Sequence, residues 1–252
     1  MTPPRNDKKM SISRILLRYL LLLERFLIKK GMKILAVIPA YKEATTIADV
    51  LERTRPFVSE MIVVNDGSPD ETAEVALKQD AIVVSHLVNR GLGAAIGTGF
   101  AVAKMRKADV VITLDADGQH DPSEIPKFLE AIENGADVVI GSRMLSRTGM
   151  PWYRQAANFL GNFSTLILFG VYVTDSQSGF RAFSRAALEK IEIKTNRMEV
   201  SSELIAEAKM HGFKIIEVPI KAIYTDYSLS KGQSFFVGLK TLFKLVLRRI
   251  TM

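Results

Sequence analysis

The chain contains no cysteine, and this absence excludes several kinds of site. None of its 252 residues can form a disulfide or supply a thiolate metal ligand. Zinc is disfavoured as well, because the chain has only three histidines and zinc sites are built mainly from cysteine and histidine. A protein without disulfides is typical of a reducing compartment, so we expect a cytoplasmic location.

The sequence also lacks an apolar run long enough to cross a membrane. A spanning helix needs about 20 apolar residues, and the N-terminal apolar stretch is interrupted by Arg14, Arg18, Glu24 and Arg25. These charges, with no small-residue cleavage site behind them, also argue against a secretory signal. We therefore expect this segment to lie on a bilayer and not to cross it.

Acidic residues are outnumbered, and the net charge is +7. The excess lies mostly in residues 1–31 and 233–252, where lysine and arginine alternate with leucine and phenylalanine at helical spacing. This pattern favours an anionic membrane surface over nucleic acid as the partner; the alternative is two helices packed on the core with solvated lysines. The expected organisation is a basic amphipathic extension (1–31), one domain (32–232) and a basic amphipathic helix (233–252), peripherally associated with the inner face of a membrane.

Short apolar runs alternate with amphipathic segments over residues 33–141. The runs expected to form strands are 33–39, 61–65, 81–88, 110–114 and 138–141, and the segments expected to form helices are 47–55, 71–79, 94–107 and 125–135. Continuous apolar runs separated by helices are typical of parallel strands that are buried on both faces. The sequence therefore predicts an α/β fold with a mainly parallel, doubly wound sheet.

Polar residues directly follow four of the expected strands. They occupy positions 39–43, 65–68, 115–120 and 141–143. The carboxyl ends of the strands border the ligand crevice in open α/β sheets. We therefore expect these four segments to converge on one site.

The third of these segments carries oxygen ligands at a spacing of two. In an extended chain Asp115, Asp117 and Gln119 would share one face, and such ligands suit Mg²⁺ or Mn²⁺, which take their remaining ligands from water and substrate phosphates. The alternative is that the carboxylates cap the next helix, which Asp121 already does. The role of His120 stays open between metal ligand, phosphate donor and structural hydrogen bonding.

A glycine-rich stretch over residues 89–97 does not match a dinucleotide-binding fingerprint. Its spacing is GxGxxxG, and it follows the third expected strand. Gly91 and its neighbours would instead allow the backbone to approach a sugar or diphosphate. A packing role for Gly97 and Gly99 is an equal alternative, and no P-loop is present.

Six short motifs follow one another along the chain. They are Pro39-Ala40-Tyr41-Lys42-Glu43, Val64-Asn65-Asp66-Gly67-Ser68, Asn89-Arg90-Gly91, Asp115-Ala116-Asp117-Gly118-Gln119-His120, Gly141-Ser142-Arg143 and Asp175-Ser176-Gln177-Ser178-Gly179-Phe180-Arg181. Together they resemble a family 2 glycosyltransferase, and their order and spacing are similar to the branch containing dolichyl-phosphate mannosyltransferase and bacterial polyprenyl-phosphate sugar transferases. The likeness extends over about residues 33–232. It implies a GT-A fold and an inverting transfer from a nucleotide-diphosphate sugar, a GDP- or UDP-hexose.

The resemblance also implies roles for individual residues. Those that would hold the base and ribose are Pro39, Tyr41, Glu43 and Asp66. Asp115 would lie near the nucleotide and the metal, and Asp117 and Gln119 would complete a metal site whose ion neutralises the departing diphosphate. The residues that would bind phosphate oxygens are Arg143, Arg154, Arg181 and Lys231, since arginine forks match phosphate geometry.

The acceptor depends on Asp175, which occupies the position of the family's usual base. A hydroxyl acceptor needs such a base, whereas an ionised lipid phosphate does not; the alternative role of Asp175 is to cap the turn that follows it. Two positions depart from the family, because Asn65 replaces a common aspartate and the segment 224–231 lacks the arginine expected in enzymes that use lipid phosphate.

The function expected is transfer of a hexose to a dolichyl- or undecaprenyl-type polyprenyl phosphate, with Asp117, Asp175 and Arg143 as catalytic residues. One alternative is transfer to a sugar or lipid hydroxyl in the synthesis of cell-envelope polysaccharide or glycolipid. A non-catalytic nucleotide-sugar-binding protein is the other, and the intact constellation from Asp115 to Gln119 argues against it. A nucleotidyltransferase would show a glycine-rich basic loop near its start, and this chain does not.

Overall fold

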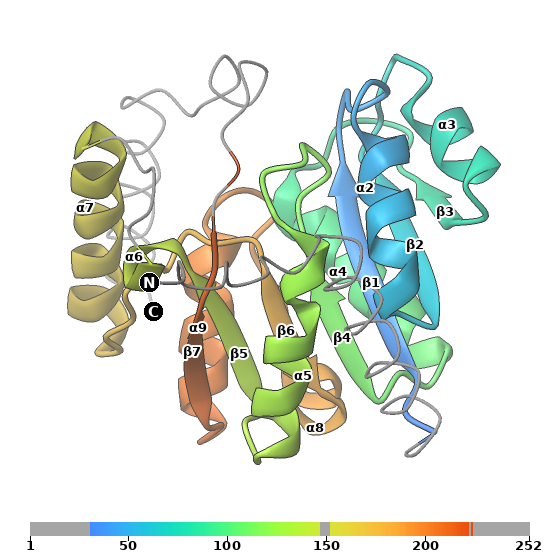
Figure 1. Ribbon diagram of the computed structural model, residues 1–252. Helices are drawn as coiled ribbons and strands as arrows, with labels where there is room; N and C mark the ends of the chain where they lie inside the picture. Colours follow the sequence, from blue (N-terminus) through green and yellow to red (C-terminus); the bar gives the residue numbers. More distant parts are fainter. Residues whose placement is uncertain (1–30, 147–151, 222, 224–252) are drawn as a thin grey trace, which may run out of the picture. The chain divides into compact units, whose positions relative to one another are not determined.

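A seven-stranded mixed sheet forms the middle layer of the part of the chain that the structure describes (Figure 1). The computed structural model describes residues 31–146, 152–221 and 223. The strands are β1 (Ile34–Ala40), β2 (Glu60–Asn65), β3 (Ile82–Ser85), β4 (Val110–Thr113), β5 (Val138–Ser142), β6 (Arg181–Ser184) and β7 (Ile215–Pro219), in the order β3-β2-β1-β4-β6-β5-β7. Of the seven strands described, only β6 runs antiparallel to its neighbours, β4 and β5. The expected mainly parallel sheet is confirmed.

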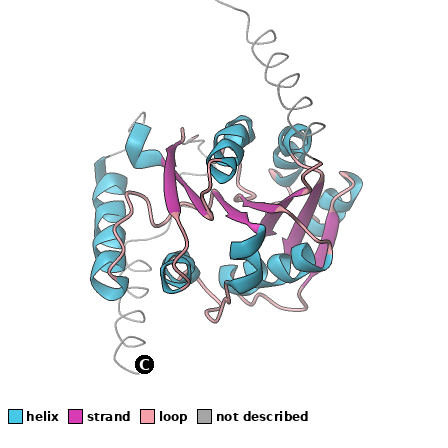
Figure 2. Cartoon of the chain, turned by 90° about the horizontal axis from the view of Figure 1, so that it is seen from below, coloured by secondary structure: helices cyan, strands magenta, loops and turns pink. Residues whose placement is uncertain are grey.

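Helices cover both faces of this sheet (Figure 2). They are α2 (Ile47–Thr54), α3 (Thr72–Lys78), α4 (Leu92–Met105), α5 (Ile125–Glu133), α6 (Arg143–Ser146), α7 (Trp152–Phe169), α8 (Arg185–Lys190) and α9 (Val200–Met210), with short 3-10 turns at Arg55–Phe57 and Pro122–Glu124. Phe100 of α4 and Leu204 of α9 share one buried cluster with Val37 of β1. Phe128 of α5 stacks on Phe180, with 4.3 Å between the ring centroids. The doubly wound architecture is thus confirmed.

The central strands are apolar because both of their faces are covered. From Ile34 to Ile38 every residue of β1 is fully buried, so the strand shows no alternation of polar and apolar side chains. Each of its buried isoleucine, leucine and valine side chains contributes about 1.5–3 kcal/mol through its burial. These strands form a rigid base for the loops at their carboxyl ends, along the upper edge in Figure 1.

Strand β3 is shorter than the expected 81–88. It ends at Ser85, after which the His86 amide donates a hydrogen bond to the carbonyl oxygen of Asn65 and the chain leaves the edge of the sheet. Leu87 and Val88 are 101% and 66% exposed. The apolar run therefore extends beyond the strand and does not indicate burial there.

The basic amphipathic helices expected at 1–31 and 233–252 fall outside the described residues, except for Gly31. Among the helices that the structure does describe, none has the length and apolarity required to span a membrane.

Candidate active site

Asp115 lies directly beyond β4, on a cleft at the carboxyl ends of the strands. The cleft is small, with a cavity volume of about 20 Å³, and Pro39 and Arg181 also line it. Gly179 approaches from the loop before β6 so closely that an added methyl group would overlap both carboxylate oxygens of Asp115. Only glycine therefore fits at position 179 while Asp115 keeps its place. The structure thus brings together three of the predicted site residues, Pro39, Asp115 and Arg181.

The two carboxylates of this segment disfavour each other's charge. Burial among protein atoms raises the pKa of Asp115, while the charges of Arg143 and Arg181 act in the opposite direction. Burial also raises the pKa of Asp117, and the negative charge of Asp115 adds to this effect. The Asp115 side chain is nevertheless 39% exposed, because one side of it faces the cleft. A cation bound here would relieve the repulsion.

The predicted metal ligands are neighbours, and their chemistry fits a divalent ion. Gln119 donates from its backbone N to Asp117 Oδ1 at 3.0 Å and from Nε2 to Asp117 Oδ2 at 2.6 Å. In the part of the chain described, no three aspartate, glutamate or histidine side chains converge as a metal site. Two mutually repelling carboxylates and an amide are suitable donors for Mg²⁺ or Mn²⁺. The set Asp115, Asp117 and Gln119 stays a prediction.

His120 has a structural role in this geometry. Its side chain is buried, and its Nδ1 accepts a hydrogen bond from the backbone N of Asp115 at 3.2 Å. Burial lowers the pKa of His120 to about 4, so the ring is neutral at pH 7. Of its three possible roles, structural hydrogen bonding is the one the contacts favour.

Asp66 holds the turn that begins α4. Its Oδ1 accepts from the backbone N of Arg90 at 2.9 Å and its Oδ2 from the backbone N of Gly91 at 2.7 Å. His86 also donates to Oδ1, from Nδ1 at 2.7 Å, and its other ring nitrogen lies 2.9 Å from Thr98 Oγ1. Gly91 has φ +101° and lies against the backbone of Asn196, so a side chain would not fit. Asp66 and Gly91 lie together, their donor-binding roles stay predictions, and His86 is a residue that the sequence interpretation missed.

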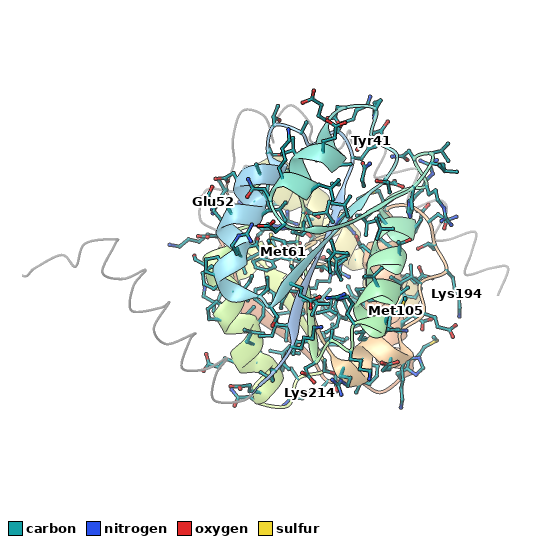
Figure 3. The ribbon with its side chains drawn as sticks, turned by 90° about the vertical axis from the view of Figure 1, so that its right-hand side faces the viewer. Tyr41, Glu52, Met61, Met105, Lys194 and Lys214 are labelled. Carbon is teal, nitrogen blue, oxygen red and sulfur yellow. The ribbon has the colours of Figure 1, made fainter. Side chains whose placement is uncertain are left out.

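The remaining predicted donor-binding residues lie around the end of β1. Tyr41 is 40% exposed at the upper edge of the molecule in Figure 3, and the ammonium group of Lys42 lies 5.4 Å from the centre of its ring. Glu43 is buried and accepts a hydrogen bond from Thr46 at 3.0 Å. Its charge contributes to the raised pKa of Asp115. The binding roles of Tyr41 and Glu43 stay predictions.

Asn65, the departure from the family, has contacts within the protein at both ends of its amide. Oδ1 accepts from the backbone N of Ser68 at 3.1 Å, and Nδ2 donates to Ser85 Oγ at 3.2 Å. The amide therefore joins the turn after β2 to the neighbouring strand.

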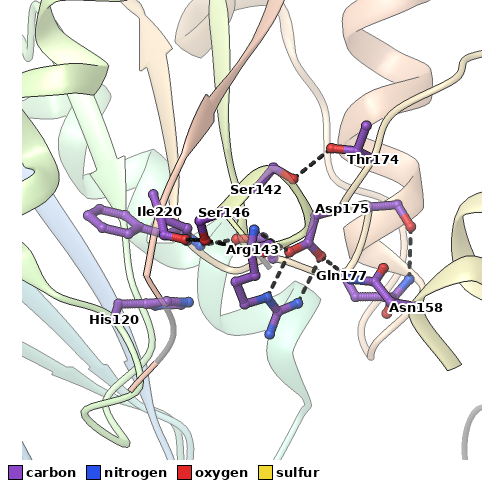
Figure 4. A network of polar contacts seen from close by, with 12 residues as sticks. His120, Ser142, Arg143, Ser146, Asn158, Thr174, Asp175, Gln177 and Ile220 are labelled. Carbon is purple, nitrogen blue, oxygen red and sulfur yellow. Dashed lines mark hydrogen bonds and ion pairs between the residues drawn. The ribbon is translucent and has the colours of Figure 1, made fainter. Parts of the chain in front are cut away.

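Arg143 and Asp175 form a buried ion pair (Figure 4). Asp175 Oδ2 accepts from the backbone N of Arg143 at 3.0 Å and from its Nε at 2.7 Å. Oδ1 accepts from Arg143 Nη2 at 2.8 Å and from Asn158 Nδ2 at 2.9 Å. Burial would raise the pKa of Asp175, but the hydrogen bonds and charge of Arg143 outweigh it and hold that pKa below its ordinary value of 3.8. Asp175 is therefore ionised and fully buried. Its carboxylate binds Arg143 on one side and, through Asn158, helix α7 on the other.

Arg181 braces the loop before β6. It is 2% exposed, and its Nε and Nη2 donate to the carbonyl oxygens of Ser178 at 2.9 Å and Ser176 at 2.7 Å. Burial lowers the pKa of Arg181 to about 10, so it stays charged at neutral pH. The side chain of Arg154 and the whole of Lys231 lie outside the described residues. The phosphate-binding roles of these three residues stay predictions.

Helix α7 buries a polar face and exposes an apolar one. Its buried side chains include Asn158, Asn162 and Thr165. Asn162 bonds to the Thr174 carbonyl and the Ser176 amide, and Thr165 to Ser202. Among the α7 side chains that the structure describes, the exposed apolar ones are Phe159 (66%), Phe163 (51%), Leu166 (37%) and Ile167 (64%), which we call the α7 apolar band. This is the reverse of the usual distribution on a surface helix. The sequence interpretation missed it, although these positions recur at helical spacing.

Comparison with known proteins gives one family. The model of "Glycosyl transferase family 2" matches residues 35–192. An uncharacterized protein of Methanocaldococcus jannaschii is 45% identical over 225 residues, covering 86% of this chain and 93% of its own. The UDP-N-acetylglucosamine–dolichyl-phosphate N-acetylglucosaminyltransferase of Methanococcus voltae is 35% identical over 238 residues, covering 85% of this chain and 95% of its own. The resemblance expected from the motifs is confirmed.

Solved structures confirm the expected GT-A fold. Glucosyl-3-phosphoglycerate synthase of Mycobacterium tuberculosis, in complex with Mn²⁺, uridine diphosphate and phosphoglyceric acid, superimposes with a TM-score of 0.68 at 24% identity. The match covers 88% of this chain and 79% of that one.

Proposed function

The chain belongs to glycosyl transferase family 2 and is a glycosyltransferase, and from that premise we propose that it transfers a hexose from a GDP- or UDP-sugar to a polyprenyl phosphate at a membrane surface. The named relative from Methanococcus voltae, a dolichyl-phosphate enzyme that covers most of this chain, supports this acceptor. The α7 apolar band supports a lipid surface, because exposed contiguous apolar side chains favour contact with an apolar phase.

The observation that carries the choice of acceptor is the Arg143–Asp175 pair. Asp175, at the position of a general base, is fully buried and accepts its hydrogen bonds from Arg143 and Asn158. A base must lie within hydrogen-bonding reach of the proton it removes. An arginine held in place at the end of β5 is instead suited to a phosphate, which needs positive charge and loses no proton.

The reaction then needs little from the protein beyond positioning and charge. A phosphate oxygen of the acceptor attacks the anomeric carbon on the face opposite the diphosphate. The bond between that carbon and the diphosphate oxygen breaks, its electron pair leaves with the diphosphate, and the configuration inverts. Arg143 holds the attacking phosphate through its positive charge, while Asp66 and Gly91 shape the turn beside the donor. A Mg²⁺ or Mn²⁺ ion held by Asp115, Asp117 and Gln119 would supply charge neutralisation.

A comparison of two acceptors tests this proposal. Purified protein is incubated with a panel of radiolabelled GDP- and UDP-hexoses, Mn²⁺ or Mg²⁺, and either a polyprenyl phosphate or the corresponding polyprenol. We expect label in the organic phase only with the phosphate. Transfer to the polyprenol at a similar rate would replace the proposal with its alternative, transfer to a hydroxyl.

A further inference from the structure

The turn at residues 174–176 is held by a carboxylate from the edge strand β7. Glu217 Oε1 accepts from Thr174 N and Thr174 Oγ1, each at 2.8 Å, and from Asp175 N at 3.2 Å. Oε2 accepts from Thr174 N at 3.0 Å. A carboxylate that accepts from consecutive backbone amides fixes the orientation of that backbone. The side chain that the turn presents is Asp175.

A second bond joins the same turn to the residue before Arg143. Ser142 Oγ lies 2.6 Å from Thr174 Oγ1. The Thr174 hydroxyl donates its proton to Glu217, which can only accept, so the Ser142 hydroxyl must donate to Thr174. Glu217 therefore sets the direction of this chain of hydrogen bonds. It ends one residue before Arg143, while the Asp175 carboxylate binds Arg143 itself.

Helix α7 holds Asp175 through Asn158. Asn158 Nδ2 donates to Asp175 Oδ1, the oxygen that also accepts from Arg143 Nη2. The other end of this amide, Oδ1, is buried, and among the described residues no group donates to it. Leaving a buried acceptor unsatisfied is unfavourable. An apolar side chain of similar size would avoid this cost, so packing alone does not account for an asparagine here.

We propose that Glu217 and Asn158 are positioning residues that act on Arg143 through Asp175. Glu217 fixes the backbone that presents Asp175, and Asn158 fixes the carboxylate. Together they orient the guanidinium toward the acceptor phosphate. The inference rests on the proposed function, because it concerns the acceptor that Arg143 binds.

Two variants with two matched controls separate positioning from general stability. Glu217→Gln replaces one carboxylate oxygen with an amide nitrogen, which cannot accept the hydrogen bonds that the turn donates. Asn158→Leu removes the hydrogen bond to Asp175 and keeps a side chain of similar volume. The control for the first is Glu124→Gln, since Glu124 is a buried carboxylate that accepts from Lys127 and Lys221 without contacting the turn. The control for the second is Thr165→Val, on the same buried face of α7.

The assay measures transfer from a competent donor to a short-chain polyprenyl phosphate, with the dissociation constant of that phosphate measured in parallel. In both test variants we expect kcat/KM for the acceptor to fall, and the dissociation constant to rise, by about tenfold, because small misplacements of a binding group have large effects. The KM for the donor should change by less than about twofold, as should every constant of the two controls.

A double variant gives the decisive comparison. In an Arg143→Ala background, Glu217→Gln and Asn158→Leu should cause no further loss, because their effect passes through Arg143. A further tenfold loss in that background, or an equal loss for donor and acceptor, would overturn the positioning role. If Arg143→Ala itself leaves acceptor binding unchanged, it is the proposed function that fails.

Discussion

Replacing Asp175 with asparagine distinguishes a residue that holds Arg143 from a catalytic base. The carboxylate accepts three hydrogen bonds from Arg143 and one from Asn158. Asparagine has one acceptor oxygen, so its amide nitrogen must face one of these donors. Removing one partner of a buried ion pair costs about 3–5 kcal/mol. Because the Arg143 side chain is 18% exposed and can turn partly toward water, we expect a loss of about 3 kcal/mol in the free energy of unfolding at pH 7.

The pH dependence gives this prediction its sign. Folding lowers the pKa of Asp175 below its ordinary value of 3.8, so the pair contributes its full stability well above that value and loses it as the pH falls through the folded pKa. The difference between wild type and Asp175→Asn in urea unfolding should therefore be constant from about pH 7 to pH 5 and shrink below pH 3.8.

The same variant is then assayed for transfer between pH 6 and 8. We expect kcat/KM for the acceptor to fall by about 10²-fold through misplacement of Arg143, with the shape of the pH profile unchanged. Two results together would refute the reasoning and make Asp175 a base. They are unfolding free energies within about 1 kcal/mol of each other at pH 7, and a fall in kcat with no change in the KM for the acceptor.

Three further predictions concern the metal site, the Asp115 contact and α7. Asp117→Ala should abolish transfer without changing the melting temperature by more than a few degrees, as should excess EDTA on the wild type; full activity in either case would contradict metal dependence. Gly179→Ala should lower turnover by about 10²-fold by displacing Asp115. The control Gly97→Ala should retain activity, because the added methyl group would meet the Ile193 side chain at 3.9 Å, an ordinary van der Waals contact. Replacing Phe159 and Phe163 with serine should weaken sedimentation with anionic vesicles while preserving transfer to a short soluble acceptor, and unchanged sedimentation would exclude the α7 apolar band as the contact.

The main sheet could be predicted because its strands are buried on both faces. A short continuous apolar run such as that of β1 is typical of a parallel strand that is covered on both faces. The polar residues that follow such strands lie at one edge of the sheet, because parallel strands have their carboxyl ends on the same side. Strands β6 and β7 gave no such signal. The first has only four residues and begins with Arg181, and the second contains Glu217 and ends in Pro219. Their places in the sheet depend on contacts with distant parts of the chain.

The sequence predicted which residues form the site better than it predicted the hydrogen bonds and ion pairs that they make. Sheet topology brings Asp115, Arg143 and Asp175 to one region, but a carboxylate can be a base, a metal ligand or half of an ion pair, depending on what surrounds it. Asp175 is paired because Arg143, 32 positions earlier, reaches it with both edge nitrogens. Sequence spacing contains no such information. The polar and the apolar residues of α7 each recur at helical spacing in the sequence. This spacing does not indicate which of the two faces points inward.

The phosphorus spectrum of the lipid product tests the central claim most directly. Polyprenyl phosphate is incubated to completion with the protein, Mn²⁺ and a competent nucleotide-diphosphate hexose, and the lipid is extracted for ³¹P NMR. The proposed mechanism predicts that the phosphomonoester resonance is replaced by that of a phosphodiester coupled to an anomeric proton, with the configuration opposite to that of the donor. A product whose phosphomonoester signal persists while hexose is attached elsewhere, or whose anomeric configuration is retained, would contradict it.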